Sequence, residues 1–233
     1  MSSMASVIRL LAFDTSTETL SVAVRHGDAV LERSGEGGAQ ASSTLIPLIQ
    51  SLLAEAGLTL RDLDAIAFGR GPGSFTGLRT ACSVAQGLGF GAGVRLLPID
   101  TLLAVAEQAR HAFGAQQVLA VLDARMEQVY SAAYDFGAGP APEAQPQLTA
   151  PEELVLAPGY VLAGNAFDAY GDRLPAGAAR HPAWPTAAAM LRLAPALLAA
   201  GRTVSPADAW PLYVRDKVAQ TTAERAAAKQ QAT

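Results

Sequence analysis

One pattern occurs twice in this chain: an apolar strand, a turn that opens with aspartate, and a second strand. The first copy covers residues 8–24 and the second covers residues 118–134. A duplicated strand-turn-strand unit implies two similar α/β lobes rather than one continuous sheet. The turn carboxylates occupy matching positions in the two copies: Asp14 with Asp123, and Glu18 with Glu127.

The duplication sets the expected domain organisation. Residues 99–112 have the pattern of a connecting helix, so we expect the first lobe to cover residues 1–104 and the second to cover residues 105–218. The polar, alanine-rich residues 219–233 are expected to form a flexible tail.

Hydrophobic periodicity and turn residues predict the remaining elements. Residues 42–56 have a helical period that Gly57 ends, and Pro47 is expected near the first turn, where a missing amide is tolerated. A helix over 186–200 is expected to be interrupted or kinked at Pro195. The other expected segments are strands at 29–34, 64–68 and 160–163, a surface loop at 137–147, a short helix opening at 149–152 and an extended piece at 212–215.

The segment 69–91 is the most distinctive stretch of the chain. Its glycines, with Pro72 between Gly71 and Gly73, fit a tight turn, and Ser74 or Thr76 can cap the following helix. Amides at a helix N-terminus can bind an anion, but the spacing matches neither the dinucleotide fingerprint nor a P-loop. The helix itself, residues 75–90, carries very small side chains, which predicts close packing inside this subunit or across an interface.

Composition excludes several function classes. The chain has 233 residues, a net charge of −4 and a pI near 5.4, which argues against a nucleic-acid footprint of its own. The single cysteine, Cys82, rules out an internal disulfide and is expected to pack among small helical residues. With no signal-peptide layout and no apolar run that could span a bilayer, we expect a cytoplasmic protein with no membrane partner.

Candidates for chemistry are few. The two carboxylate pairs described above could hold a metal or a water between the lobes, or they could simply cap turns. None of the three histidines lies in a spacing typical of a helical metal site. No nucleophile-base pair stands out either, so we expect no catalytic residue and no metal site.

Five motifs, in the right order, resemble the TsaB family, also called YeaZ, from about residue 10 to residue 218. The glycine-rich block is the most specific of them. The motifs are residues 11–17 (LAFDTST), 69–79 (GRGPGSFTGLR), 98–102 (PIDTL), 121–130 (VLDARMEQVY) and 211–215 (PLYVR).

The resemblance implies the fold and the role. The implied fold is the actin-like, Hsp70-like and sugar-kinase (ASKHA) fold of two duplicated α/β lobes. The implied role is that of a non-catalytic subunit that dimerises with the catalytic relative TsaD and activates it for threonylcarbamoyl transfer to tRNA. Helical histidines bind the metal in TsaD, and residues 40–44 of this chain contain none.

The resemblance also implies partners and cofactors. TsaD and the ATPase TsaE are the expected partners, with a homodimer when the chain is alone and tRNA reached only through the complex. No cofactor is expected for the isolated chain, since ATP and a metal ion belong to the partner subunits.

The resemblance places the partner interface on helices 42–56 and 75–90. Nucleotide motifs of the superfold are eroded, because the first turn lacks glycine and the second carries bulky residues, so we expect weak or no ATP binding. The expected remnants of a nucleotide site are Asp14, Ser16, Thr17, Asp123 and Gly164. The expected interface residues are Leu45, Leu48, Ile49, Leu52, Thr76, Arg79, Thr80, Ser83, Val84 and Gly87.

Two alternatives remain open. A small ATP-dependent kinase of the same superfold would use Asp14 or Asp123 as metal-binding carboxylates. A peptidase is the second alternative, and the residues give it no support because no nucleophile lies in a recognisable setting.

Overall fold

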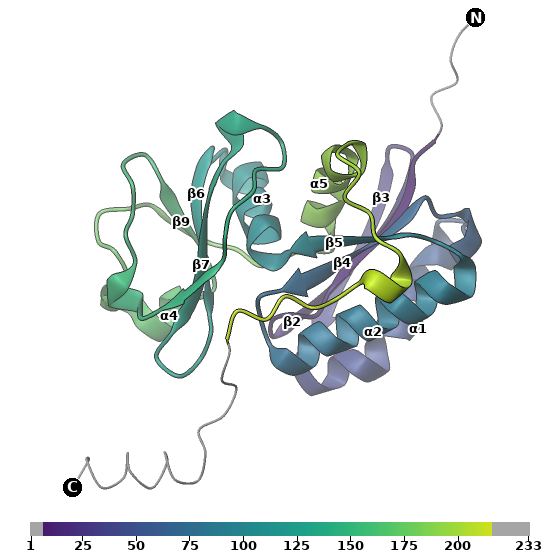
Figure 1. Ribbon diagram of the computed structural model, residues 1–233, viewed down its shortest axis with the longest axis horizontal. Coiled ribbons are helices and arrows are strands. Elements are labelled where there is room, and N and C mark those ends of the chain that lie inside the picture. Colours follow the sequence, from purple (N-terminus) through teal and green to yellow (C-terminus); the bar gives the residue numbers. More distant parts are fainter. Residues whose placement is uncertain (1–6, 216–233) are drawn as a thin grey trace, which may run out of the picture.

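A computed structural model describes residues 7–215 and contains two five-stranded mixed sheets, one in each half of the chain (Figure 1). In the first sheet, the central β1 pairs antiparallel with β2 and parallel with β4. The strand order is β3-β2-β1-β4-β5. The strands are β1 (Arg9–Asp14), β2 (Thr19–His26), β3 (Ala29–Glu36), β4 (Ala65–Gly71) and β5 (Leu96–Asp100).

The second sheet repeats this topology. Its order is β8-β7-β6-β9-β10, with β6 antiparallel to β7 and parallel to β9. Each strand therefore matches the strand five places earlier, which confirms the predicted duplication. The strands are β6 (Gln117–Asp123), β7 (Val129–Asp135), β8 (Gln147–Thr149), β9 (Val161–Gly164) and β10 (Arg180–Pro182).

The helix that follows each sheet packs on the other lobe. Helix α3 (Thr101–Phe113) follows β5 and packs on β6, whereas α5 (Ala187–Ala199) follows β10 and packs on β1. The two helices also contact each other, and both lie between the sheets in Figure 1. One hydrophobic core therefore runs through both lobes and joins them.

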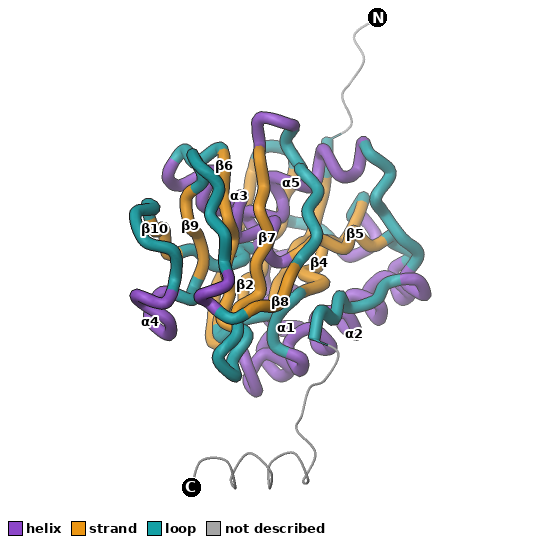
Figure 2. The backbone as a smooth tube through the Cα atoms, turned by 60° about the vertical axis from the view of Figure 1, so that its left-hand side comes forward, coloured by secondary structure: helices purple, strands orange, loops and turns teal. Residues whose placement is uncertain are grey.

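The outer faces of the sheets are covered unequally (Figure 2). On the first sheet, α1 (Ala41–Glu55) and α2 (Phe75–Ala92) close a second core. On the second sheet, the corresponding connections hold only α4 (Phe167–Tyr170) and short 3₁₀ turns over a smaller core. The 3₁₀ helices are η1 (Gly38–Gln40), η2 (Leu60–Asp62), η3 (Phe136–Ala138), η4 (Pro151–Glu153), η5 (Gly171–Arg173) and η6 (Pro206–Asp208).

Both helical prolines lie inside continuous helices, and the kink that was the second expectation at Pro195 stays a prediction. Pro47 lies in the interior of α1 rather than near its first turn, because the helix already begins at Ala41. Helix α5 is not interrupted at Pro195 but continues to Ala199. Packing of its apolar face on the first sheet offsets the lost hydrogen bond.

The division of the chain at residue 104 stays a prediction. That position falls inside α3, whose residues pack with both sheets. The expected tail, residues 219–233, lies outside the described residues. None of the helices within residues 7–215 is long and apolar enough to cross a bilayer.

Candidate functional site

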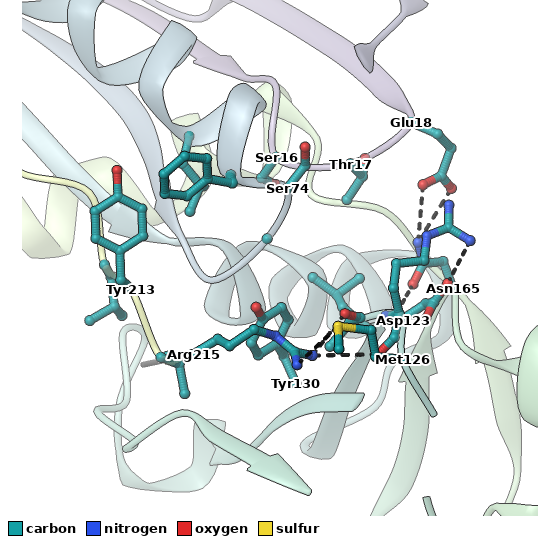
Figure 3. A pocket seen from close by; sticks show the side chains of 18 of the residues that line it. Ser16, Thr17, Glu18, Ser74, Asp123, Met126, Tyr130, Asn165, Tyr213 and Arg215 are labelled. Carbon is teal, nitrogen blue, oxygen red and sulfur yellow. Dashed lines mark hydrogen bonds and ion pairs between the residues drawn. The ribbon is translucent and has the colours of Figure 1, made fainter. Parts of the chain in front are cut away.

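A cleft of about 430 Å³ lies where the two lobes meet (Figure 3). The duplicated turns form two of its walls, and the start of α2 together with the end of the described chain closes the others. Phe75, Leu78, Leu122 and Tyr130 give the cleft an apolar lining beside its polar turns. This mixture suits a ligand or a peptide segment with both apolar and polar parts.

The carboxylate of Asp14 organises the first turn from inside. Its Oδ1 accepts hydrogen bonds from the amide of Ser16 at 2.8 Å and from the Ser16 hydroxyl at 2.6 Å. Burial raises the pKa of Asp14 to about 6, although the hydrogen bonds from Ser16 oppose the rise. Gly69 leaves room for this carboxylate, because a Cβ there would lie 1.8 Å from Oδ2. The amide of Ser16 is thus bound within the protein and is not directed at a ligand.

Glu18 links the two lobes at the edge of the cleft. Its carboxylate accepts hydrogen bonds from Asn165 Nδ2 at 3.2 Å and from Trp184 Nε1 at 2.8 Å. Burial alone would raise the pKa of Glu18, but the bonds from Trp184, the Glu18 backbone amide and Asn165, together with the charge of Arg125, outweigh it, so the pKa lies below its usual value. Asn165 also accepts from the amide of Asp123 at 3.0 Å, so one side chain connects both turns.

The second turn is held in an unusual backbone conformation. Arg125, Met126 and Glu127 have φ values of 60°, 55° and 59°, a left-handed region that is costly for residues other than glycine. Asp123 stabilises the turn by accepting from the Arg125 amide at 2.7 Å, while the Tyr170 hydroxyl donates to it at 2.8 Å. As in the first turn, the aspartate binds the backbone of its own loop.

The five expected nucleotide-site residues are not all at the cleft. Ser16, Thr17 and Asp123 line it, whereas Asp14 is fully buried beneath it. Gly164 is not among the residues that line the cleft, and a Cβ at that position would lie 1.8 Å from the carbonyl oxygen of Val121 on the neighbouring strand. Its glycine is required by the pairing of β9 with β6. Asn165, Arg125 and Arg215 also line the cleft, although the expected nucleotide-site set omitted them. Arg125 and Asn165 lie close in sequence to the predicted Asp123 and Gly164, whereas only the tertiary fold brings Arg215 there.

The carboxylate pairs do not meet across the lobes. Asp14 and Asp123 cap their own turns, and Glu127 pairs with Arg173 on the surface. Within residues 7–215, no group of three or more histidine, cysteine, aspartate or glutamate side chains could hold a metal ion. For Asp14 and Asp123 the geometry supports turn capping, whereas Glu18 and Glu127 bind side chains outside their own turns.

Helix α2 offers a second candidate surface. Ser74 caps its start by accepting from the Gly77 amide at 3.5 Å. Gly77 and Gly89 face inward, since a Cβ would lie 1.8 Å from the Thr15 carbonyl oxygen at the first and 2.9 Å from the Leu96 side chain at the second. These glycines let α2 approach the first sheet closely.

Two other glycines of α2 have no such role. Gly87 and Gly91 are exposed, and a Cβ at either position would meet no atom of the described part of the chain within 4 Å. Ser83 is exposed one turn before Gly87, so a strip of small residues faces outward along α2. We call Ser83, Gly87 and Gly91 the small-residue strip.

Three of the expected interface residues require correction. Leu45, Ile49 and Leu52 are at most 1% exposed and form the core between α1 and the first sheet. Their helical period was recognised correctly, but it marks the inner face of α1 and not the outer one. The remaining residues of that set are exposed or half-buried: Leu48, Thr76, Arg79, Thr80, Ser83, Val84 and Gly87.

Comparison with known proteins identifies the family. The family model for TsaD, described as tRNA N6-adenosine threonylcarbamoyltransferase, matches residues 37–168. The Escherichia coli tRNA threonylcarbamoyladenosine biosynthesis protein TsaB is 35% identical over 91% of this chain and 96% of its own length. The Haemophilus influenzae TsaB is 44% identical over 53% of this chain and 52% of its own.

A solved structure agrees with these relatives. YeaZ from Pseudomonas aeruginosa superposes with a TM-score of 0.82 at 36% identity, covering 88% of this chain and 99% of that one. Together with the duplicated topology, these matches confirm the two-lobed ASKHA fold expected from the sequence. The chain therefore belongs to the TsaB family, whose curated members are named tRNA threonylcarbamoyladenosine biosynthesis proteins.

Proposed function

We propose that this protein is a non-catalytic subunit that pairs with a TsaD-type subunit and activates it. The complex would transfer a threonylcarbamoyl group to N6 of the adenosine next to the anticodon in tRNA. The chain would act in the cytoplasm, form a homodimer when alone, and reach tRNA and the ATPase TsaE only within the complex.

The observation that carries this proposal is the outward strip on α2. A glycine inside a helix costs about 1 kcal/mol relative to alanine, and no packing contact among residues 7–215 requires one at Gly87 or Gly91. A partner helix that approaches closely would supply the reason, because small residues at a helix contact allow tight ridge-into-groove packing. The family match covers both α1 and α2, which agrees with a docking role for this part of the chain.

The cleft supports a non-catalytic role in a different way. The amides of Ser16 and Arg125, one in each turn, donate to the turn's own aspartate. Phosphate binding in such turns depends on free backbone amides. ATP and its metal ion would then be bound by the partner subunits.

The test is complex formation between the full chain and its cognate TsaD-type subunit, measured by size exclusion and by stimulation of transfer activity. Gly87→Leu places a bulky side chain on the exposed strip without entering the core, so we expect at least tenfold weaker association. Ala199→Leu, at an exposed end of α5, is the matched control and should bind normally.

Ala85 is unsuitable for this test, because it is completely buried and a larger side chain there would disturb folding. If Gly87→Leu folds and still binds and stimulates TsaD as the wild type does, the docking surface is assigned to the wrong face.

A further inference from the structure

The last described segment, residues 209–215, runs along α2 and then crosses to the second lobe (Figure 1). On the first lobe it is anchored by backbone contacts. The carbonyl oxygen of Ala209 accepts from Cys82 Sγ at 3.3 Å and from Gln86 Nε2 at 3.0 Å. The amide of Leu212 donates to the Arg70 carbonyl at 2.6 Å, which ties the segment to the end of β4.

Tyr213 continues the contact at the start of α2. Its ring lies 5.4 Å from the ring of Phe75, and its hydroxyl accepts from Arg79 Nε at 3.2 Å. The Arg79 guanidinium in turn lies 3.7 Å from the centre of the Phe75 ring. These three side chains form one cluster, in which a residue of the expected interface holds the C-terminal segment.

Arg215 makes the contact on the other side of the cleft. Its guanidinium donates to the carbonyl oxygens of Ala124 at 3.0 Å and Arg125 at 3.4 Å, and it approaches Met126 Sδ at 3.6 Å (Figure 3). These acceptors belong to the left-handed turn described above, whose backbone needs outside stabilisation. A charged donor shared by two carbonyls supplies it.

The segment therefore touches both lobes, and residues 212–215 form one wall of the cleft. We propose that residues 209–215 act as a strap that joins α2 to the turn 124–127, sets the width of the cleft and transmits docking on α2 to the second lobe. The transmission step rests on the proposed function, since it takes α2 as the docking helix. The contacts of residues 209–215 with both lobes do not depend on the proposed function.

The first experiment uses the full chain alone and measures amide hydrogen exchange by mass spectrometry. In Arg215→Ala the turn loses its outside donor, so amides of residues 124–128 should exchange about tenfold faster, while those of α1 keep their wild-type rates. Arg202→Ala is the control, because Arg202 also pairs with a second-lobe residue, Glu143, but outside the cleft. Equal exchange of residues 124–128 in wild type, control and Arg215→Ala would overturn the strap.

Arg215→Lys serves if Arg215→Ala does not fold. It keeps the charge but lacks the planar guanidinium, whose Nη2 contacts both carbonyls while Nη1 contacts Met126 Sδ, so a smaller acceleration, about threefold, is expected at the same amides. Wild-type exchange at residues 124–128 in this variant would also count against the strap.

The second experiment adds the TsaD-type subunit. Docking should slow exchange at residues 124–128 by about threefold in the wild type and leave it unchanged in Arg215→Ala, although both proteins bind. Binding without any change at that turn in the wild type would overturn the transmission step. Failure to bind at all would contradict the proposed function instead, and the strap would still be judged by the free chain.

Discussion

The two lobes share one sheet topology but differ in the helices that cover them. Between the third and fourth strands, the first lobe has the 15-residue α1, whereas the second has only the three residues of η4. Between the fourth and fifth strands, the first has the 18-residue α2, whereas the second has the four residues of α4 and the three of η5. The two lobes therefore share the same sheet topology. The long outer helices α1 and α2, and the exposed small residues of α2, occur in the first lobe only.

This difference suggests a test of the proposed docking role, because α2 has one face that packs in the core and another that is exposed. The inner faces of α1 and α2 close the core of the first lobe, and the outer face of α2 carries glycines that the core does not need. A helix that only stabilised the lobe would have no reason to expose glycine. The predictions below test this separation and the asymmetry of the lobes.

The largest effect is expected in the inner face of α1. Leu45→Ala removes a side chain that is 0% exposed, and it should lower the free energy of unfolding by about 2–5 kcal/mol in a denaturant titration. Leu48→Ala is the matched change at a half-buried position of the same helix and should cost less. A smaller loss for Leu45 than for Leu48 would mean that the faces of α1 are wrongly assigned.

The second-largest effect is a pH dependence of stability that we expect from Asp14 but not from Asp123. The pKa of Asp14 is about 6 in the folded protein and about 4 when unfolded, so the folded state binds more protons between these values. Stability conferred by this group is therefore complete below about pH 4 and falls by about 3 kcal/mol as the pH rises to about 6. Above that pH the loss is constant.

Urea titrations across this pH range would measure the loss. Asp14→Asn should abolish the fall in the free energy of unfolding with rising pH. Asp123→Asn, at the matching position of the second turn, should leave that fall unchanged. The same pH dependence of the free energy of unfolding in wild type and Asp14→Asn would show that another group is responsible.

Helix caps should give effects of about 1 kcal/mol. The Thr186 hydroxyl accepts from the Ala189 amide at 3.1 Å at the start of α5, whereas the bond from Gly77 to Ser74 at the start of α2 is 3.5 Å. Thr186→Ala should therefore lower the melting temperature more than Ser74→Ala. The reverse order would indicate that Ser74 does more than cap its helix.

The smallest effect is expected for nucleotide binding to the isolated chain. Titration calorimetry of the isolated chain with Mg-ATP should give little or no heat, because the amides of Ser16 and Arg125 bind their own aspartates. Firm binding would favour the kinase alternative and would remove the distinction between this chain and a nucleotide-binding relative.

The sequence predicted the frame of the molecule well. The repeat around Asp14 and Asp123 was enough to predict two similar lobes, since strand pairing follows from local alternation and turn residues. Three strands were missed. β8 and β10 have only three residues each, which carry too little pattern to be recognised, and the end of the five-residue β5 was included in the connecting helix predicted at 99–112. Their existence depends on pairing with neighbours that are distant in the chain.

The candidate sites were predicted only in part. Helical period cannot say which apolar face is buried, and Leu45, Ile49 and Leu52 were assigned to the wrong one. No local sequence pattern shows that α3 packs on the second sheet and α5 on the first. The contact of Arg215 with residues 124–126 likewise has no local sequence pattern. The sequence of residues 211–215 gives no indication of the contacts that Tyr213 and Arg215 make with α2 and with the second turn.

The most direct test of the central claim is a hydrogen-exchange comparison of the full chain with and without its cognate TsaD-type subunit, read separately on the outer elements of each lobe. The account predicts protection of residues 76–91 on α2 and no direct protection of α4 in the second lobe. Protection confined to α4 and its neighbouring turns, with α2 unchanged in the complex, would contradict it.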